Sequence, residues 1–311
     1  AMEDLYRKES MEIASQPMRT LNRLDEDSII LTMPSYSRRL KRFAVKIVSE
    51  YRNNPKNFSL PVQGGVIVLI DANNSQALAI LESATLTATR TGAVSGLATR
   101  LLSREDSNSV AVVGSGQQAR AQLEAVCLVR KIYDARVFSR DFSHAERFAA
   151  EMSSNLGVTC VPHSERRTAL RGADIIILAT NSSEPVLEWG EVSRGAHINS
   201  IGTLPERREL DLDTVCKSRL YVDAREGVLK EAGDVIHAIS SGRITENHIL
   251  GDLGELLSGK SKGRQDRKDV TLFKSVGFAM QDVYASDRVF ETISRDGALV
   301  GKISVPELRS P

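Results

Sequence analysis

Short runs of apolar and β-branched residues alternate with longer amphipathic runs through the middle of the chain. Ser109–Val113 and Ala135–Ser139 have the composition of strands, and the helical pattern of Ser143–Leu156 follows the second of them. The unbroken apolar stretch within Ala173–Thr180 is typical of a strand that is buried on both faces. Further strands are predicted at Val158–Val161, His197–Ile201 and Arg219–Val222. This alternation predicts an α/β fold with a doubly wound parallel sheet of the Rossmann type.

The residues on either side of this region have a different pattern. Strands are predicted at Val45–Ser49, Gly65–Asp71 and Ala77–Glu82, a turn at Asn53–Asn57, and long helices at Leu86–Leu102 and Leu272–Ser286. The Ala, Gly and Thr residues of the first helix permit another backbone to approach closely. The second helix is expected to cross back, so that Arg288–Val305 completes the first unit. We therefore expect two domains, with residues 1–103 and 285–311 forming a smaller α+β domain and residues 104–284 forming the Rossmann-type domain.

A glycine-containing turn joins the first strand of the Rossmann-type region to a helix. Gly114 permits a tight turn, Gly116 lets the backbone approach a pyrophosphate, and Ala119 is the small residue where the helix packs on the strand. The free N–H groups at the start of this helix, at Gln117 and Gln118, provide an anion site. The pattern predicts a dinucleotide site, with an ordinary strand-to-helix turn as the alternative.

Charge and cysteine content exclude several other kinds of protein. The 41 basic and 40 acidic side chains give a formal net charge of +1, which would gather neither nucleic acid nor anionic lipid. No apolar run approaches the roughly 20 residues of a membrane-spanning helix, and the N-terminus lacks the pattern of a signal peptide. The three cysteines have no paired spacing and the five histidines form no cluster, so we expect buried thiols and no metal. These features predict a cytoplasmic protein that binds a small molecule.

Besides the glycine turn, five ordered segments carry a resemblance to a known family: Met33–Tyr36, Val45–Ser49, Leu86–Ala93, Glu231–Asp234 and Leu272–Gly277. Over nearly its whole length the chain resembles the ornithine cyclodeaminase and mu-crystallin family, which also contains archaeal-type alanine dehydrogenases and cyclic ketimine reductases. The resemblance implies a homodimeric NAD(P)-dependent enzyme that acts on an amino acid or its imine. It also implies that the smaller domain binds the substrate and forms the dimer contacts. Relative to the family, roughly thirty residues are missing ahead of a helical segment at Met2–Ser15, and Ala1 resembles a tag remnant.

Reduction of a C=N bond requires an anchor for the substrate carboxylate and a proton donor for the nitrogen. The resemblance assigns Arg19 and Arg90 to the carboxylate, which a guanidinium matches with two parallel hydrogen bonds. Lys46 interrupts an otherwise apolar strand, so it lies on the wet face or in a cleft, and the resemblance favours the cleft. Burial there would lower its pKa and let it both contact the carboxylate and relay a proton. For the two arginines, exposed surface positions are the alternative.

The end of the second Rossmann-type strand bears on the choice of cofactor. An acidic residue there binds the ribose hydroxyls of NAD, whereas arginine with small hydroxylated neighbours suits the 2′-phosphate of NADP. Ser139 stands at the position of the acid and Arg140 follows, which favours NADP, while Asp141 keeps NAD open. The resemblance adds further cofactor-binding candidates: Thr180, Asn181, Ser182, Ser275 and Gly277. For the first three, which follow a predicted strand, an ordinary turn is the alternative.

One departure from the family affects the predicted reaction. Ornithine cyclodeaminases carry an aspartate shortly after the Ile-Gly of the strand that matches His197–Gly202, but here no acid precedes Pro205. Deamination with cyclisation needs a base at the amine, so this argues against ornithine, although Glu206 leaves the point open. We therefore expect an NAD(P)H-dependent reductase of a cyclic α-imino acid, such as Δ1-pyrroline-2-carboxylate. Alanine dehydrogenase, ornithine cyclodeaminase and a non-catalytic, mu-crystallin-like binding protein are the alternatives, the last being disfavoured by the three cations together.

Overall fold

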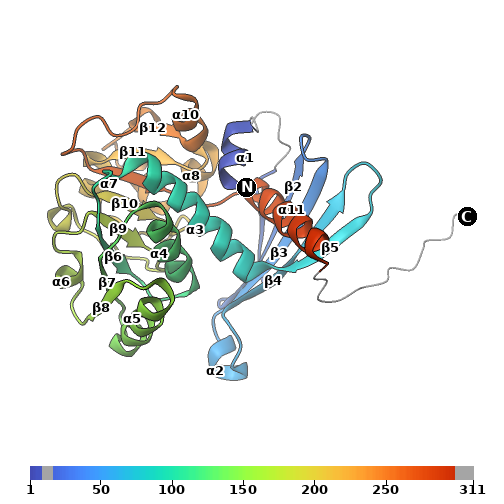
Figure 1. The fold of residues 1–311 in the computed structure, drawn as a ribbon, viewed down its shortest axis with the longest axis horizontal. Helices are drawn as coiled ribbons and strands as arrows, with labels where there is room; N and C mark the ends of the chain where they lie inside the picture. Colours follow the sequence, from blue (N-terminus) through green and yellow to red (C-terminus); the bar gives the residue numbers. More distant parts are fainter. Residues whose placement is uncertain (9–16, 298–311) are drawn as a thin grey trace, which may run out of the picture.

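The computed structural model describes residues 1–8 and 17–297, which form two sheets (Figure 1). The larger sheet consists of β6 (Ser109–Val113), β7 (Asp134–Phe138), β8 (Thr159–His163), β9 (Ile175–Leu178), β10 (His197–Ser200), β11 (Arg219–Val222), β12 (Ile249–Asp252) and β13 (Thr271–Lys274). Its paired strands are all parallel, in the order β12-β11-β13-β10-β9-β6-β7-β8. The predicted α/β fold with a Rossmann-type sheet is confirmed.

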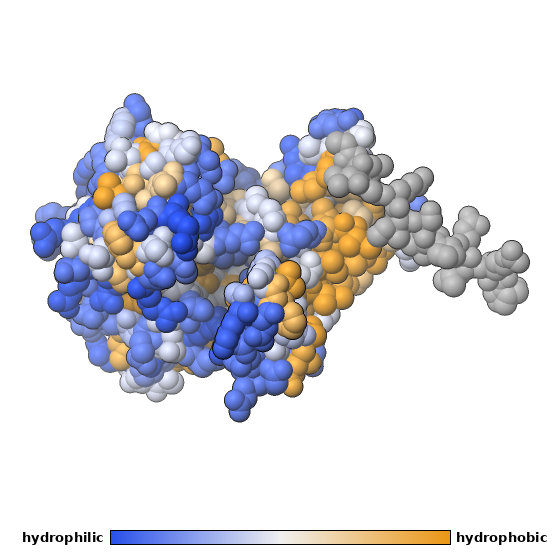
Figure 2. All heavy atoms as spheres, turned by 90° about the horizontal axis from the view of Figure 1, so that it is seen from below, coloured by the Kyte–Doolittle hydropathy of each residue, from blue (hydrophilic) through white to orange (hydrophobic). Residues whose placement is uncertain are grey.

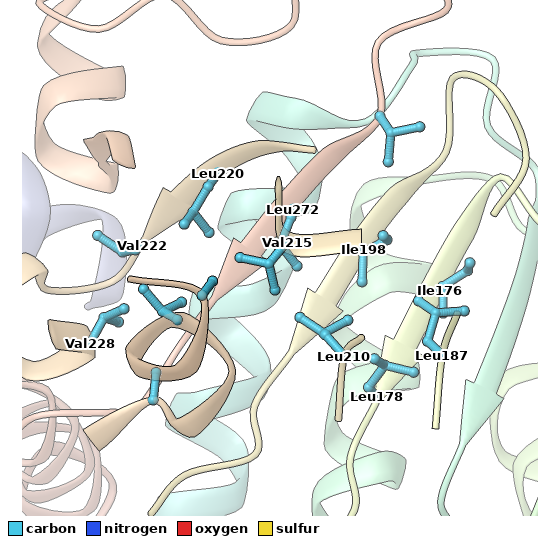
Figure 3. Packing of buried hydrophobic residues seen from close by; sticks show 14 of the residues in the cluster. Ile176, Leu178, Leu187, Ile198, Leu210, Val215, Leu220, Val222, Val228 and Leu272 are labelled. Atoms are coloured by element: carbon cyan, nitrogen blue, oxygen red, sulfur yellow. The ribbon is translucent and has the colours of Figure 1, made fainter. Parts of the chain in front are cut away.

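Helices cover both faces of the larger sheet. Successive residues of a strand point to opposite sides, and here apolar residues on both sides are buried under helices. The helices are α4 (Gln117–Val129), α5 (Phe142–Leu156), α6 (Arg166–Leu170), α7 (Leu212–Lys217), α8 (Arg225–Glu231), α9 (Gly233–Ser240) and α10 (Leu253–Ser258). On one face, Ala111 and Val113 of β6 belong to the cluster that contains residues of α7, α8 and α9, part of which Figure 3 shows. On the other face, Val110 and Val112 pack with α4 and α5.

The smaller sheet is antiparallel and follows the chain order. It consists of β1 (Thr20–Arg23), β2 (Ser28–Ser37), β3 (Arg42–Tyr51), β4 (Gln63–Asp71) and β5 (Ala77–Glu82), with α2 (Asn54–Phe58) between β3 and β4. The helix α11 (Ala279–Asp296) covers one face, where Ala44 and Ile67 are buried, and α1 (Met2–Lys8) packs against α11. The opposite face carries exposed Ile47, Val66 and Ile80, and Figure 2 shows a broad hydrophobic surface on this part of the molecule.

The helix α3 (Ser83–Leu102) links the two sheets and packs closely on α4 (Figure 1). A Cβ atom on Gly92 would lie 2.4 Å from the carbonyl oxygen of Ala121, so the helices can approach this closely only at a glycine. The close approach that we predicted from the composition of this segment is therefore found.

The prediction of one helix over Leu272–Ser286 was wrong. Thr271–Lys274 forms β13, and α11 begins only at Ala279. Leu272 and Phe273 are fully buried because β13 lies between β10 and β11, and a short apolar run of this kind does not distinguish a strand from a helix. The strands β1, β2 and β12 and the short helix α2 were also not predicted as such.

Parts of other predictions lie outside the described residues: the end of the segment Arg288–Val305 beyond position 297, and positions 9–15 of the N-terminal helix. The division of the chain at residues 104 and 285 stays a prediction. The returning helix α11 begins before the second of these boundaries.

Within the described ranges, no helix is long and apolar enough to cross a membrane. The cytoplasmic location stays a prediction. In the same part of the chain, no three His, Cys, Asp or Glu side chains are grouped to hold a metal ion. Cys160 is buried, but Cys127 and Cys216 are only partly buried, so the expectation of buried thiols was wrong for two of the cysteines.

Candidate active site

A cavity of about 800 Å³ lies between the two sheets. One side is formed by the loops that follow β6, β7, β9, β10 and β13, the edge at which open α/β sheets bind their ligands. The other side is formed mainly by β2, β3 and α3. Of the predicted site residues, all except Ala119 and Asp141 line this cavity. Residues that are widely separated in the sequence are therefore brought to one place.

The glycine turn forms one end of the cavity. Gly114 has a φ of +110°, and a Cβ atom there would lie 2.3 Å from the carbonyl oxygen of Ala179. Gly116 is the N-cap of α4 without a side-chain cap, and the space where its Cβ would stand is empty. Ala119 is fully buried where α4 packs on the sheet, as the third small position requires. The turn therefore has room for a phosphate group beside the uncapped start of a helix.

The loop after β7 separates the residues that bear on the cofactor. Ser139 and Arg140 line the cavity, and the hydroxyl of Ser139 is 3.0 Å from that of Ser115 in the glycine turn. The carboxylate of Asp141 instead caps α5 and accepts hydrogen bonds from the backbone N–H (2.9 Å) and hydroxyl (2.8 Å) of Ser143. The Ser143 hydroxyl lowers the pKa of Asp141, and its backbone N–H lowers it further. Asp141 is therefore engaged in a local structural role.

Two cations that line the cavity meet at one buried carboxylate. Lys46 Nζ lies 2.9 Å from Oδ2 of Asp282, and Arg90 Nε lies 3.1 Å from Oδ1 of the same residue. Burial lowers the pKa of Lys46 to about 8, against the opposing effect of the Asp282 charge. Burial alone would raise the pKa of Asp282, but the two cations outweigh it and the pKa is lowered. Lys46 thus stays paired with Asp282 and has a pKa of about 8.

The helix α11 and the loop before it set the position of Arg90. Gln281 Oε1 accepts a hydrogen bond from Arg90 Nη1, and Gln281 Nε2 donates to the hydroxyl of Tyr6 on α1 at 2.9 Å. Gly277 has a φ of +71°, and a Cβ atom there would lie 2.5 Å from Arg90 Nη1. The guanidinium therefore lies directly against this glycine.

Arg19 reaches the cavity from the segment before β1. Its Nη2 donates to the carbonyl oxygens of Val276 (3.0 Å) and Gly277 (2.7 Å) and forms an ion pair with Glu231 at 2.7 Å. These contacts tie the smaller sheet to the loop after β13. Because Nη2 makes all three contacts, the Nε and Nη1 atoms of Arg19 contact neither these two carbonyl oxygens nor Glu231.

The loop after β13 is itself held by a buried acid. Asp223 accepts hydrogen bonds from the hydroxyl of Ser275 (2.8 Å) and the backbone N–H of Gly277 (2.7 Å). Burial raises the pKa of Asp223, and these donors oppose the shift. Ser275 and Gly277 therefore form a fixed part of the cavity wall.

Comparisons with known proteins identify the family of the chain. A model of the ornithine cyclodeaminase/mu-crystallin family matches residues 1–297. The chain belongs to this family. It is 33% identical over 276 residues to the Delta(1)-pyrroline-2-carboxylate reductase of Bacillus cereus, covering 88% of this chain and 84% of the relative. It is 34% identical over 283 residues to the ketimine reductase mu-crystallin of Mus musculus, covering 90% and 85%.

A solved structure of the family has the same fold over almost the whole chain. It is the Thermococcus litoralis Delta(1)-pyrroline-2-carboxylate reductase in complex with NADH and L-proline. The TM-score is 0.90 and the sequence identity 42%, with 94% of this chain and 90% of that chain covered.

In the sequence, Glu206 is the acid that keeps ornithine cyclodeaminase as an alternative reaction for this chain. Its side chain is exposed and does not line the cavity. Its neighbour Arg207 does line the cavity and forms an ion pair with Glu50 of β3 at 3.1 Å.

Sequence reasoning missed the acids that hold the site together: Glu209, Asp223, Glu231 and Asp282. Asp223 directly follows an apolar strand, Asp282 lies in the segment that forms α11, and Glu231 lies in a segment that carries the resemblance. Glu209 lies among charged residues, where the sequence gives no such signal.

Proposed function

We propose that this protein is an NAD(P)H-dependent reductase of a cyclic α-imino acid, Δ1-pyrroline-2-carboxylate or a related ketimine, which it converts to L-proline or a homologue. The observation that carries the proposal is that Lys46 and Arg90 line the same cavity as the glycine turn. The two curated relatives and the solved structure, whose names describe reductases of this kind, support it.

The part of the cavity around the glycine turn has the chemical features that a dinucleotide cofactor requires. The crowded turn at Gly114, the open position at Gly116 and the uncapped start of α4 suit a pyrophosphate. Bound NAD(P)H supplies the hydride that reduces the imine carbon. The loops after β9, β10 and β13 line the same cavity as Lys46 and Arg90 and would hold the nicotinamide end of the cofactor.

The three cations have complementary tasks in this proposal. Arg90 and Arg19 bind the substrate carboxylate through guanidinium N–H groups on the cavity side. Lys46, with a pKa of about 8, is largely protonated at neutral pH and holds a proton at Nζ for the substrate nitrogen. Asp282 keeps both Lys46 and Arg90 in place from the buried side.

The wall beside Lys46 is apolar. Leu31, Met33 and Val48 line the cavity, and the strand register places them on the same face of the sheet as Lys46. Glu50, the acid on this face, is engaged by Arg207. Such a wall accommodates a hydrocarbon ring, and among the described residues that line it no unpaired acid faces a second substrate amine. This favours a cyclic imino acid over ornithine.

NADP is the proposed preferred cofactor, with NAD as the alternative. Arg140 lines the cavity beside Ser139 and suits a 2′-phosphate, whereas Asp141 is engaged at the N-terminus of α5. Comparing kcat/KM for NADPH and NADH tests this choice. A preference for NADH would show that the ribose hydroxyls are bound in spite of Arg140.

We also propose a homodimer that forms through the open face of the smaller sheet. Ile47, Val66 and Ile80 are 43%, 38% and 54% exposed on adjacent strands, and a second copy would cover them. Light scattering during size-exclusion chromatography tests this, and the Ile47→Lys variant should shift the protein toward the monomer.

Turnover by the purified protein tests the reaction. NADPH should be oxidised when Δ1-pyrroline-2-carboxylate or its six-membered homologue is added without ammonia. Oxidation that occurs only with pyruvate and ammonia would assign an alanine dehydrogenase instead. Conversion of ornithine with no reduction of either imine would overturn the proposal.

A further inference from the structure

The carboxylate of Glu209 joins the ends of two neighbouring strands. Its Oε1 accepts hydrogen bonds from the backbone N–H (2.7 Å) and the hydroxyl (2.8 Å) of Thr180, which follows β9. Its Oε2 accepts from the hydroxyl of Ser200, at the end of β10, and from the backbone N–H of Gly202, both at 2.8 Å. Thr180 and Gly202 line the cavity, but Glu209 does not. The carboxylate therefore fixes two segments of the cavity wall from behind.

A second carboxylate and a lysine hold Glu209 itself. Its backbone N–H donates to Oδ1 of Asp234 at 2.7 Å, and Asp234 forms an ion pair with Lys274 at the end of β13. Lys274 Nζ also donates to the hydroxyl of Ser200 at 2.8 Å. This network ties together the ends of β9, β10 and β13, and Glu209, Asp234, Ser200 and Lys274 are all buried.

Stability alone does not account for such an arrangement. A buried ion network is often no more stabilising than well-packed apolar side chains, because each charge loses its hydration. Here Lys274 pairs with Asp234 and reaches Glu209 only through the Ser200 hydroxyl, so the Glu209 carboxylate is held by hydrogen bonds alone. The donors to Glu209 belong to Thr180, Ser200 and Gly202, and two of these residues form the cavity wall.

We infer that Glu209 is a positioning residue, which holds the Thr180 and Gly202 segments in the arrangement that binds the nicotinamide nucleotide. The inference rests on the proposed function, because it requires that the cavity binds such a nucleotide. In Glu209→Gln the side chain keeps its shape, but an NH2 group replaces one acceptor and then faces the N–H of Thr180 or of Gly202. The two segments would separate, whereas Lys46 and Arg90 would keep their contact with Asp282.

The chain offers a matched control at the opposite end of the same sheet. The Asp174 carboxylate, just before β9, accepts hydrogen bonds from the backbone N–H groups of Asn108 (2.9 Å) and Ser109 (3.2 Å). It thus also bridges neighbouring strands, but away from the cavity lining. Asp174→Asn should lower the melting temperature and leave nucleotide binding unchanged.

The experiment is a fluorescence titration of NADPH and NADH with the wild-type protein and the Glu209→Gln, Ser200→Ala and Asp174→Asn variants, with melting temperatures measured in parallel. We expect Kd to rise about tenfold or more in Glu209→Gln, which is the size of effect that follows from losing hydrogen bonds to a charged group. Ser200→Ala removes a fully buried hydroxyl away from the cavity, and Kd should rise a few-fold. KM for the imino acid should change less than Kd for the nucleotide.

An unchanged Kd in Glu209→Gln would overturn the inference, as would an equal rise in Asp174→Asn, which would mark a general loss of stability. If Glu209→Gln does not fold, an unchanged Kd in Ser200→Ala has the same meaning. Wild-type protein that binds neither nucleotide would reject the proposed function itself. Nucleotide binding without imine reduction would reject the proposed reaction, and the titration would still decide the role of Glu209.

Discussion

The Nζ atom of Lys46 lies 2.9 Å from Oδ2 of Asp282, and both side chains are almost completely buried. Lys46 is on β3 and Asp282 is on α11, and they meet because α11 covers the face of the sheet to which Lys46 points. Burial lowers the pKa of Lys46 to about 8, and the charge of Asp282 opposes that shift. The pKa of Lys46 therefore lies near physiological pH, and the charge of Asp282 keeps this pKa from falling further.

Replacement of Asp282 by Asn should lower the pKa of Lys46 further, because it removes the charge that raises it. The proposed reduction uses the ammonium form of Lys46, so the rate declines as the pH rises through the pKa of this group. We expect the alkaline limb of the kcat profile to move to lower pH by ~1 unit in Asp282→Asn. Steady-state rates with Δ1-pyrroline-2-carboxylate across the pH range measure this shift.

Asp287→Asn is the matched control for this profile. Asp287 lies on the same helix and forms an ion pair with Arg42 at 2.8 Å, but neither residue lines the cavity. Its substitution should leave the alkaline limb where it is in the wild-type protein. An alkaline limb at the same pH in Asp282→Asn would mean that a group other than Lys46 titrates.

Lys46→Met should abolish turnover and leave nucleotide binding intact. Methionine keeps much of the side-chain volume but has no proton for the substrate nitrogen and no charge for the carboxylate. We expect kcat/KM to fall by ~10²–10⁴-fold. The Kd for NADPH should not change, because the glycine turn and Arg140 belong to the other side of the cavity. Substantial activity in this variant would remove Lys46 from the mechanism.

The two halves of the site differ in how far the sequence predicts them. In the glycine turn, the strand, Gly114, Gly116 and the helix are consecutive, so their local pattern is enough. The contacts of Asp282 depend on α11 lying against β3, which no local pattern encodes. The apolar run from Leu272 onward also conceals the change from strand to loop to helix, because β13 has only four residues.

Gly277→Ala should weaken the binding of the substrate carboxylate. The new Cβ would stand 2.5 Å from Arg90 Nη1 at a φ of +71°, so the guanidinium would have to move. We expect KM for the imino acid to rise ~10-fold and the free energy of unfolding to fall by ~1 kcal/mol, the latter from the positive φ. Steady-state kinetics and urea denaturation measure the two effects separately.

Gly259→Ala separates the backbone effect from the contact with Arg90. Gly259 ends α10 with a φ of +76°, and no atom lies within 4 Å of its missing Cβ. This variant should lose similar stability with no change in KM. If the KM of Gly277→Ala equals that of Gly259→Ala, the position of Arg90 does not control substrate affinity.

His197 should make the stability of the fold fall in mild acid. Burial lowers the pKa of His197 to about 3, with a further contribution from Arg264, and the ring lies between Thr271 Oγ1 (2.9 Å) and Asn199 Oδ1 (3.2 Å). Between the unfolded value of about 6.5 and about 3, the unfolded chain binds a proton that the folded protein does not. The contribution of His197 to the free energy of unfolding therefore has its full value above pH ~6.5. Below that pH, the contribution decreases by ~1.4 kcal/mol per pH unit.

The His197→Gln variant isolates this contribution. Urea denaturation of both proteins at pH 8, where histidine is neutral in the folded and unfolded chains, gives the fixed difference caused by the substitution itself. As the pH falls from 6 to 4, that difference should shrink or change sign, because only the wild-type chain gains a proton at this position on unfolding. Parallel curves for the two proteins over this range would mean that the folded protein accommodates a protonated His197, contrary to its full burial against Thr271 of β13.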